Sequence, residues 1–454
     1  MFRQCNNLKE IEFNNNTRTN NLQEMSSMFR ECERLEYINT KIFKTNKLTN
    51  LNYVFYGCRR LKQLDLTNFD TSNVKEMIAT FRKCRHILKI DVSSFDTSKV
   101  TIMDEMFRYL WDIEYIDISK FKLENLESAE YMFANCDVLK RIDFNNKTRT
   151  ESLINIRGMF EECYSLKNIN TEIFKMNKLN NLNNLFDKCY SLKEINLSNL
   201  LTGSITELKA TFRFCKNLTE IYFPFFYSDG ITSMKEIFNG CSNLTQVNFE
   251  KNITFSYLND LESAFYDCVS LTSLDLSFFN FEKIYFANKM FYNCVNLTYL
   301  ALPNRMHFLR DASYMFGNCY KLTSINLAFL ENNNFLEKTD GMFKNCETIN
   351  ELIFPSFIAD NLYSSNFMFN ECFNLKKIDL GFVIVRNIRF ISMMFSKCNN
   401  LTYINIYQFN TKKVEFFDYL FEGVQKNVRI IYDNEITKDK IEEEIKNLTL
   451  KTSL

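Results

Sequence analysis

A segment of about 26 residues recurs along the whole chain, and this period constrains the fold more than any other feature. Its wording is Phe-x-x-Cys-x-x-Leu-x-x-Ile-x-Leu, first met at Phe2, Cys5, Leu8 and Ile11. The interval between copies varies little, so no second domain is inserted between them. Uninterrupted repeats fold as a stack in which each unit contacts its neighbours. We therefore predict one continuous solenoid over residues 1–432, with about 17 repeats.

A phenylalanine opens every copy of the motif. The slot is filled at Phe2, Phe29, Phe55, Phe81, Phe107, Phe133, Phe160, Phe186, Phe212, Phe238, Phe265, Phe291, Phe316, Phe343, Phe369, Phe395 and Phe421. A cofactor-binding motif would not occur in every unit, whereas a core position does. We predict an aromatic spine in which these rings stack through the interior.

All fifteen cysteines fall in one column of the repeat, at the third position after the phenylalanine, where only Leu110 and Val424 replace them. Buried free thiols are the favoured interpretation, because stacked helices hold Cα atoms beyond the limit of about 7 Å for a disulfide. A disulfide framework in an exported chain is the alternative. A metal ladder has less support, because closely spaced ligand pairs and histidine partners are absent from the sequence.

The apolar spacing changes within each copy. Over residues 70–84 apolar side chains recur at intervals of three and four, which predicts a helix, and over residues 61–66 they alternate with polar ones, which predicts a strand. The chain is therefore expected to be an α/β protein of helix–strand repeats with a parallel β-sheet. Helices need about 8–10 Å between axes and strands about 4.8 Å. The helix side is therefore the longer one, and the stack is expected to curve with its sheet on the concave side. Because Leu61-Lys-Gln-Leu-Asp-Leu66 matches the leucine-rich-repeat pattern L-x-x-L-x-L, we expect a curved leucine-rich-repeat solenoid.

A longer period lies on top of the short one. Residues 1–70 and 132–201, at an offset of 131, are identical at 36 of 70 positions. Core positions alone would not produce this agreement. We infer that a block of five repeats was duplicated.

The outward positions of the predicted strands are mostly acidic or amide residues. Several of them form a candidate ligand-contact patch on the concave face: Asp65, Lys89, Asp91, Tyr115, Asp117, Arg141 and Asp143. Concave solenoid faces are where such proteins bind. Stacked aspartates about 4.8 Å apart repel one another unless something compensates. A solvated, self-neutralising polar face is the alternative interpretation, and a calcium site lacks the Asp-x-Asp-x-Asp-Gly loop that would support it.

The two ends of the chain differ from the repeats. Residues 433–454 are expected to form a C-terminal capping helix and tail, with Ile441, Ile445 and Leu448 on one helical face. The sequence begins inside a repeat, so we expect the N-terminal cap to be missing from this chain and read nothing from the lack of a signal peptide.

Composition excludes several classes of function. The 55 basic residues balance the 55 acidic ones without a basic cluster, so nucleic acid is not an expected partner. No apolar run approaches the length that a membrane-spanning helix needs, so no membrane span is predicted. With two histidines, no metal-ligand spacing and no phosphate-binding loop, we expect neither a metal, nor a cofactor, nor an enzyme.

Particular segments resemble a known family. The stretches Leu64–Val74 and Ile90–Met103, with Glu105-Met-Phe107 after them, are similar to the repeat of BspA-like leucine-rich-repeat surface proteins. The resemblance covers residues 1 to about 432 and rests on the repeated motif with Met-Phe-x-x-Cys. It implies a protein that is secreted or on the cell surface, often a lipoprotein, and that attaches to host proteins or to other cells.

The sequence predicts a noncatalytic scaffold that binds protein or glycan. The resemblance implies that it is an adhesin-like protein of the cell surface. Its partners would lie on a host or neighbouring cell. The alternative is an intracellular interaction or structural scaffold in the cytoplasm of an AT-rich bacterium or protist, because many unpaired cysteines suit a reducing compartment.

Overall fold

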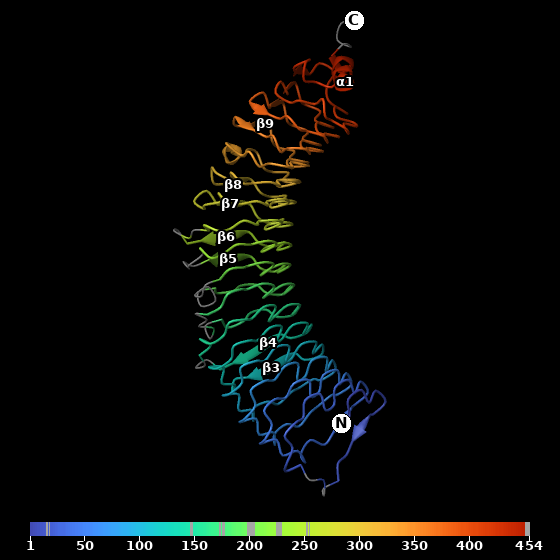
Figure 1. The fold of residues 1–454 in the computed structure, drawn as a ribbon, viewed down its shortest axis with the longest axis vertical. Helices are drawn as coiled ribbons and strands as arrows, with labels where there is room; N and C mark the ends of the chain where they lie inside the picture. Colours follow the sequence, from blue (N-terminus) through green and yellow to red (C-terminus); the bar gives the residue numbers. More distant parts are fainter. Residues whose placement is uncertain are drawn as a thin grey trace. The chain divides into compact units, whose positions relative to one another are not determined.

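Each repeat forms one turn of a parallel solenoid in the computed structural model, and successive turns stack on one another (Figure 1). The structure describes residues 1–14, 17, 19–145, 149–171, 174, 178–197, 205–223, 229–250, 253 and 255–449. The chain forms two compact units. Unit 1 contains residues 1–227 and 248–251, and unit 2 contains residues 228–247 and 252–454.

Short parallel strands occupy the segment predicted to be extended in several repeats, but the strand predicted over residues 61–66 is absent there, although Leu64 and Leu66 are buried as expected. Unit 1 contains β1 (Glu10–Ile11), β2 (Tyr37–Ile38), β3 (Tyr115–Ile118), β4 (Arg141–Phe144) and β5 (Glu220–Phe223), and β6 (Gln246–Phe249) has residues in both units. Unit 2 contains β7 (Ser273–Asp275), β8 (Tyr299–Ala301), β9 (Glu351–Ile353), β10 (Phe357–Ile358), β11 (Lys377–Asp379), β12 (Val383–Ile384), β13 (Tyr403–Asn405) and β14 (Arg429–Ile431). The parallel partners are β1 with β2, β3 with β4, β7 with β8, β10 with β12, and β9, β11, β13 and β14 in one sheet.

Side chains alternate along these strands as the sequence predicts. In β3, Tyr115 and Asp117 are exposed whereas Ile116 and Ile118 are buried. Strands one repeat apart are in register, so Tyr115 lies beside Arg141 and Asp117 beside Asp143. The exposed side of this ladder, called the strand face below, therefore carries two columns of outward residues.

A second ladder runs through the other side of each turn. In unit 1, single parallel bridges connect Asn50, Glu76, Ile102, Ser128, Asn155, Asn181 and Glu207 in succession. In unit 2, the same slot connects Ser233 through Phe286 to Phe416. Where a strand pair is also present, as between β3 and β4, two turns are thus bonded at two separate places, which fixes their spacing on both sides.

The helix predicted over residues 70–84 is absent, and a succession of turns takes its place. The N–H groups of Met77, Ala79 and Phe81 donate to carbonyls one repeat further on, at 2.9, 2.8 and 3.0 Å. Among the described residues, the one α-helix is α1 (Asp439–Thr449). There is also one 3-10 turn in these residues, η1 (Ala328–Leu330). The fold is therefore a parallel solenoid rich in strand-like stacking, without the predicted helix side on which the expected curvature rested.

Left-handed residues explain why this segment does not become helical. Ala79 and Lys83 have φ values of 50° and 64°, and they flank Phe81 two positions before and two after. Glycine takes the later slot at Gly57, where φ is 75°. Two residues with positive φ, four positions apart, interrupt a right-handed helix. They also turn alternate amides toward the neighbouring repeat, where these amides find carbonyl partners.

The predicted aromatic spine is present in both units. From Phe2 to Phe212 in unit 1, successive rings lie 5.5–6.0 Å apart between centroids. From Phe238 to Phe421 in unit 2, the same distance is 5.4–6.0 Å. This spacing is too small for stacked helices, which need about 8–10 Å. It is the spacing of strand-like chains with an aromatic ring in each.

The C-terminal end carries the predicted helix. Helix α1 lies at the end of the array (Figure 1), and its Ile441 and Ile445 are buried. The preceding chain is bonded to the last repeats, because Thr411 donates its N–H to the carbonyl of Ile436 at 2.9 Å. The tail from residue 450 to 454 lies outside the described residues.

Candidate functional site

The seven residues predicted as a ligand-contact patch all lie on the strand face of unit 1. Asp65, Lys89 and Asp91 belong to two neighbouring turns, and Tyr115, Asp117, Arg141 and Asp143 come from β3 and β4. All are exposed except Asp143, which is half-buried. The structure therefore places them on one surface, and it brings six of them together in two groups of different character, with Asp117 in neither.

The first group is a closed cluster around Asp143. Arg141 donates from Nε and Nη2 to the two carboxylate oxygens at 2.6 and 2.8 Å, and the Tyr115 hydroxyl donates to Oδ2 at 2.7 Å. The Arg141 guanidinium also lies 5.6 Å from the Tyr115 ring centroid. The bond to Asp143 raises the pKa of Tyr115 to about 12, since losing the proton would lose that bond. This cluster presents a fixed phenol ring and a fixed cation to solvent.

The aspartate column is compensated by hydroxyl residues two positions further on. Asp65 accepts from the N–H and Oγ1 of Thr67 at 3.1 and 2.7 Å. Asp91 accepts from the N–H and Oγ of Ser93 at 3.0 and 2.6 Å. Asp117 accepts from the N–H of Ser119 at 2.9 Å.

These bonds to Thr67, Ser93 and Ser119 are the main reason why the pKa values of the three aspartates lie below the usual range. Repulsion from Asp65 acts in the opposite sense on the pKa of Asp91 and is the weakest influence on it. The stacked charges are therefore tolerated, and each aspartate closes a turn at the end of its strand.

The second group lines a hollow of about 640 Å³ between turns. Asp65, Lys89 and Asp91 contribute to its wall, with Lys41 and Tyr37 from the preceding turn. Lys41 Nζ lies 3.6 Å from Asp65 Oδ2. The positive charge of Lys89 lowers the pKa of Asp91. The hollow thus has charges of both signs in reach of a ligand, whereas Tyr115, Arg141 and Asp143 lie outside its wall.

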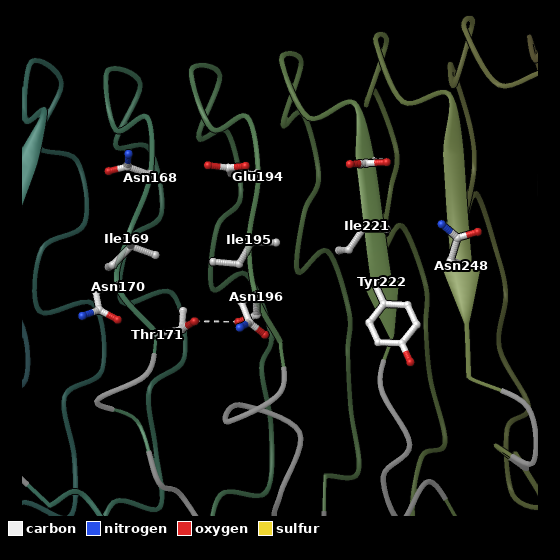
Figure 2. A pocket seen from close by; sticks show the side chains of 11 residues that line it. Asn168, Ile169, Asn170, Thr171, Glu194, Ile195, Asn196, Ile221, Tyr222 and Asn248 are labelled. Atoms are coloured by element: carbon white, nitrogen blue, oxygen red, sulfur yellow. Dashed lines mark hydrogen bonds between the residues drawn. The ribbon is translucent and has the colours of Figure 1, made fainter.

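Sequence reasoning missed a second hollow further along the same face. It has a volume of about 480 Å³, and its walls come from the turns around Asn168, Glu194 and Tyr222 (Figure 2). The offset that relates the two copies of the five-repeat block maps most of the first hollow onto this one. That offset was the signal that could have located it.

The cysteine column is buried and engaged with the backbone. Fourteen of the fifteen free thiols are buried, and Cys5 is half-buried. Cys58 donates from Sγ to the carbonyl of Phe29 in the preceding repeat at 3.1 Å, and Cys136 does the same to Phe107 at 3.1 Å. Burial raises the pKa of Cys136 to about 12. These thiols serve the core, as the favoured interpretation predicts.

Within the ranges that the structure describes, no three His, Cys, Asp or Glu side chains gather as a metal site would require. The aspartates for which calcium was considered are instead bonded to Ser, Thr or Arg groups. Of the helices in the described ranges, none has the length and apolar character needed to cross a membrane.

Comparison with known families decides the assignment. A model described as "BspA type Leucine rich repeat region (6 copies)" matches residues 130–261, 209–338, 262–389 and 312–444, which together exceed half of the chain. This chain belongs to the BspA-type leucine-rich repeat family. A second model, described as "Mycoplasma protein of unknown function, DUF285", matches residues 1–108, 23–146 and 49–174. No curated protein matches the chain.

Several solved structures resemble this BspA-type chain. A leucine-rich repeat protein from Bacteroides ovatus has a TM-score of 0.48 and 18% identity, over 95% of this chain and 86% of that one. A leucine rich cell surface protein from Faecalibacterium prausnitzii has a TM-score of 0.36 and 17% identity, over 76% and 86%. A leucine-rich repeat protein from Eubacterium ventriosum has a TM-score of 0.39 and 16% identity, over 74% and 88%.

The family match confirms the resemblance predicted from the Met-Phe-x-x-Cys spacing. The chain is a leucine-rich repeat scaffold of the BspA type, a class of architecture suited to binding.

Proposed function

We propose that this BspA-type chain is a noncatalytic, adhesin-like scaffold at a cell surface, which recognises a protein or a glycan through its strand face. The observation that carries the proposal is the cluster of Tyr115, Arg141 and Asp143. Tyr115 is 43% exposed although it is a large ring, and it adds nothing to the core. Tyrosine and arginine are enriched among the residues that dominate binding energy.

The rigidity of this cluster supports a binding role. Arg141 and Tyr115 each hold their position through bonds to one carboxylate, so few rotamers remain to be lost when a ligand arrives. The backbone beneath is fixed by the β3–β4 register and by the spine of stacked rings. Asp143 already accepts three hydrogen bonds, which suits it to holding neighbours in place rather than to accepting a proton from a substrate.

Location is tested by shaving intact source cells with protease and identifying the released peptides. Peptides from the strand face, including residues 65–143, are expected from unbroken cells. The intracellular scaffold remains the second candidate, because the fifteen free thiols of the column suit a reducing compartment. Release of these peptides only after lysis would select that second candidate.

The contact surface is tested with Tyr115→Ala and Arg141→Ala in binding assays on matrix proteins and glycans. Either change is expected to weaken binding about tenfold or more, because each removes a fixed contact. Lys377→Ala is the matched control, since Lys377 lies 5.6 Å from the Tyr403 ring on the strand face of unit 2. Equal loss in all three variants would show that Tyr115 and Arg141 have no special role.

A further inference from the structure

The two hollows of unit 1 occupy equivalent places in the duplicated five-repeat block. Asn39 and Thr40 of the first correspond to Asn170 and Thr171 of the second at the offset between the two copies. The same offset relates Asp65 to Asn196, Lys89 to Glu220 and Asp91 to Tyr222. The duplication therefore copied a cavity together with the repeats that enclose it.

A threonine builds the hollow in both copies. The Thr171 hydroxyl donates to the carbonyl of Asn196 in the next turn at 2.6 Å (Figure 2). Thr40 donates in the same way to the carbonyl of Asp65. The turns at residues 168–171 and 194–197 contain no strand, unlike β3 and β4. At this point the Thr171 side chain, and not a pair of β-strands, connects the two turns.

The floor of the second hollow differs from the equivalent floor of the first. Ile169 and Ile195 are half-buried there, whereas their counterparts Ile38 and Leu64 are buried. Apolar side chains therefore line the bottom of the second hollow within reach of a ligand. Its volume of about 480 Å³ lies within the range of about 300–1,000 Å³ for small-molecule sites.

The walls also changed their chemistry after duplication. The first hollow carries Lys41 and Lys89 together with Asp65 and Asp91, two charges of each sign. The second carries Glu194 and Glu220, with no basic residue among its described lining residues, and amides at Asn168, Asn170, Asn196 and Asn248. The second hollow therefore repels an anionic ligand, whereas the charges of the first hollow balance.

Amides are suited to ligands rich in hydroxyl groups. Each Asn side chain offers both donors and an acceptor, and a hydroxyl is itself both donor and acceptor. Asn170 and Asn196 project from neighbouring turns on the same row, and Tyr222 follows in the next turn (Figure 2). The Tyr222 ring is 48% exposed, and its hydroxyl donates to Glu250, which fixes the ring at the edge of the hollow.

We infer that the hollow formed by Asn170, Glu194, Asn196, Glu220 and Tyr222 is a separate binding site for an uncharged sugar residue of a glycan. The sugar's hydroxyls bond the amides and carboxylates, and its C–H face lies on Ile195 and on the Tyr222 ring, whose negative face attracts polarised C–H groups. A lysine-rich peptide fits less well, because its ammonium groups are donors alone and would engage the two carboxylates, whereas sugar hydroxyls are both donors and acceptors. This inference rests on the proposed binding function and names one ligand class and one site for it.

The test exposes the purified full chain to an array of uncharged oligosaccharides of hexoses and N-acetylhexosamines, their sialylated and sulfated counterparts, and lysine-rich peptides. Binding to at least one uncharged oligosaccharide is expected, with weaker signal for its charged counterpart. An array on which lysine-rich peptides alone bind, or on which nothing binds, would overturn the inference.

Variants then locate the site. Asn196→Ala and Tyr222→Ala are expected to weaken binding of the uncharged glycan about tenfold or more, from the loss of one or two directed contacts. Asn326→Ala and Tyr299→Ala make the same residue changes at exposed positions of unit 2, outside both hollows, and are expected to leave that affinity unchanged. Equal loss in both pairs, or no loss in the first pair, would place the glycan elsewhere and overturn the assignment.

Two further variants guard against a folding defect. Asn196→Asp keeps the shape of the side chain and removes the amide donor, and Glu220→Gln keeps the shape and removes a charge. The first is expected to weaken binding of the uncharged glycan, and the second to raise the signal of its sialylated counterpart. If cell shaving places the protein on the surface while the array stays blank, this inference fails and the proposed function stands.

Discussion

Removing one ring from the aromatic spine should uncouple the repeats on either side of it. Phe81 is fully buried, and its ring lies 6.0 Å from that of Phe55 and 5.7 Å from that of Phe107, with interplanar angles of 2° and 15°. Phe81→Ala therefore loses the transfer energy of a whole ring, leaves a cavity and breaks two stacked pairs. Such a change costs about 3–5 kcal/mol, and two aromatic pairs at about 0.5–1.5 kcal/mol each favour the upper end.

Denaturant unfolding followed by circular dichroism measures this loss, and hydrogen exchange locates it. Protection should fall first at the N–H groups of Met77 and Phe81, which bond the next repeat. Phe382→Ala is the matched control, because Phe382 is 67% exposed, and its cost should stay within about 0.5 kcal/mol. If Phe81→Ala were as mild as Phe382→Ala, the spine would not be what holds the repeats together.

Three further outcomes follow from the structure. Lys289→Gly should raise the unfolding free energy by about 0.5–1 kcal/mol, because Lys289 is exposed at a φ of 56° that glycine adopts without a Cβ clash, and Lys289→Ala should give no such gain in the same melt. A thiol reagent at pH 8 should label few groups in the folded chain, chiefly half-buried Cys5, and all fifteen after unfolding, because the other fourteen are buried and burial raises the pKa of thiols such as Cys136; extensive labelling of folded protein would contradict the buried column. Hydrogen bonds from Ser72 lower the pKa of Asp70. The contribution of Asp70 to the free energy of unfolding is therefore full above the unfolded pKa of about 3.9 and is lost as the pH falls through the lower folded value. The melting temperature of Asp70→Asn should approach that of the parent as the pH falls from 5 to 2, and a constant difference would contradict this account.

The interior of this fold could be predicted well because it repeats. One column of phenylalanine and one of cysteine locate the spine and the buried thiols without any structure, and the register of β3 and β4 follows from the alternation of Ile116 and Ile118. The strand positions and the helix α1 were likewise visible as apolar periods. Each copy of the repeat packs against a nearly identical neighbour, so the same core positions recur in every copy and can be recognised from the sequence.

The predicted helix failed for a reason that periodicity does not reveal. Apolar positions three and four apart lie on one side of a chain of turns as well as on one side of a helix. The deciding facts are the 5.7 Å spacing of the Phe81 and Phe107 rings and the positive φ of Ala79 and Lys83. Neither residue type announces a left-handed conformation, because alanine and lysine are ordinary helix formers. The backbone bonds to the next repeat impose it, and those bonds are invisible in one copy of the motif.

The candidate patch was located by sequence, but its internal chemistry was not. The spacing Asp-x-Thr at Asp65 and Asp-x-Ser at Asp91 is a local signature of a side chain that closes a turn. The hydroxyl groups of Thr67 and Ser93 bond these carboxylates and so compensate the repulsion between stacked aspartates without a ligand. The bond of Tyr115 to Asp143, two residues on different turns, needed the parallel register before it could be drawn.

The two hollows show how such a scaffold can acquire a new specificity without a new fold. Thr40 and Thr171 keep the same bond to the next turn, so the cavity survives duplication, because its cause lies in the backbone spacing. Lys89, Asp91, Glu220 and Tyr222 are all exposed, so the side chains at these outward positions can differ between the two hollows without disturbing the stack. The spine therefore fixes where a site can form, and the outward columns decide what it binds.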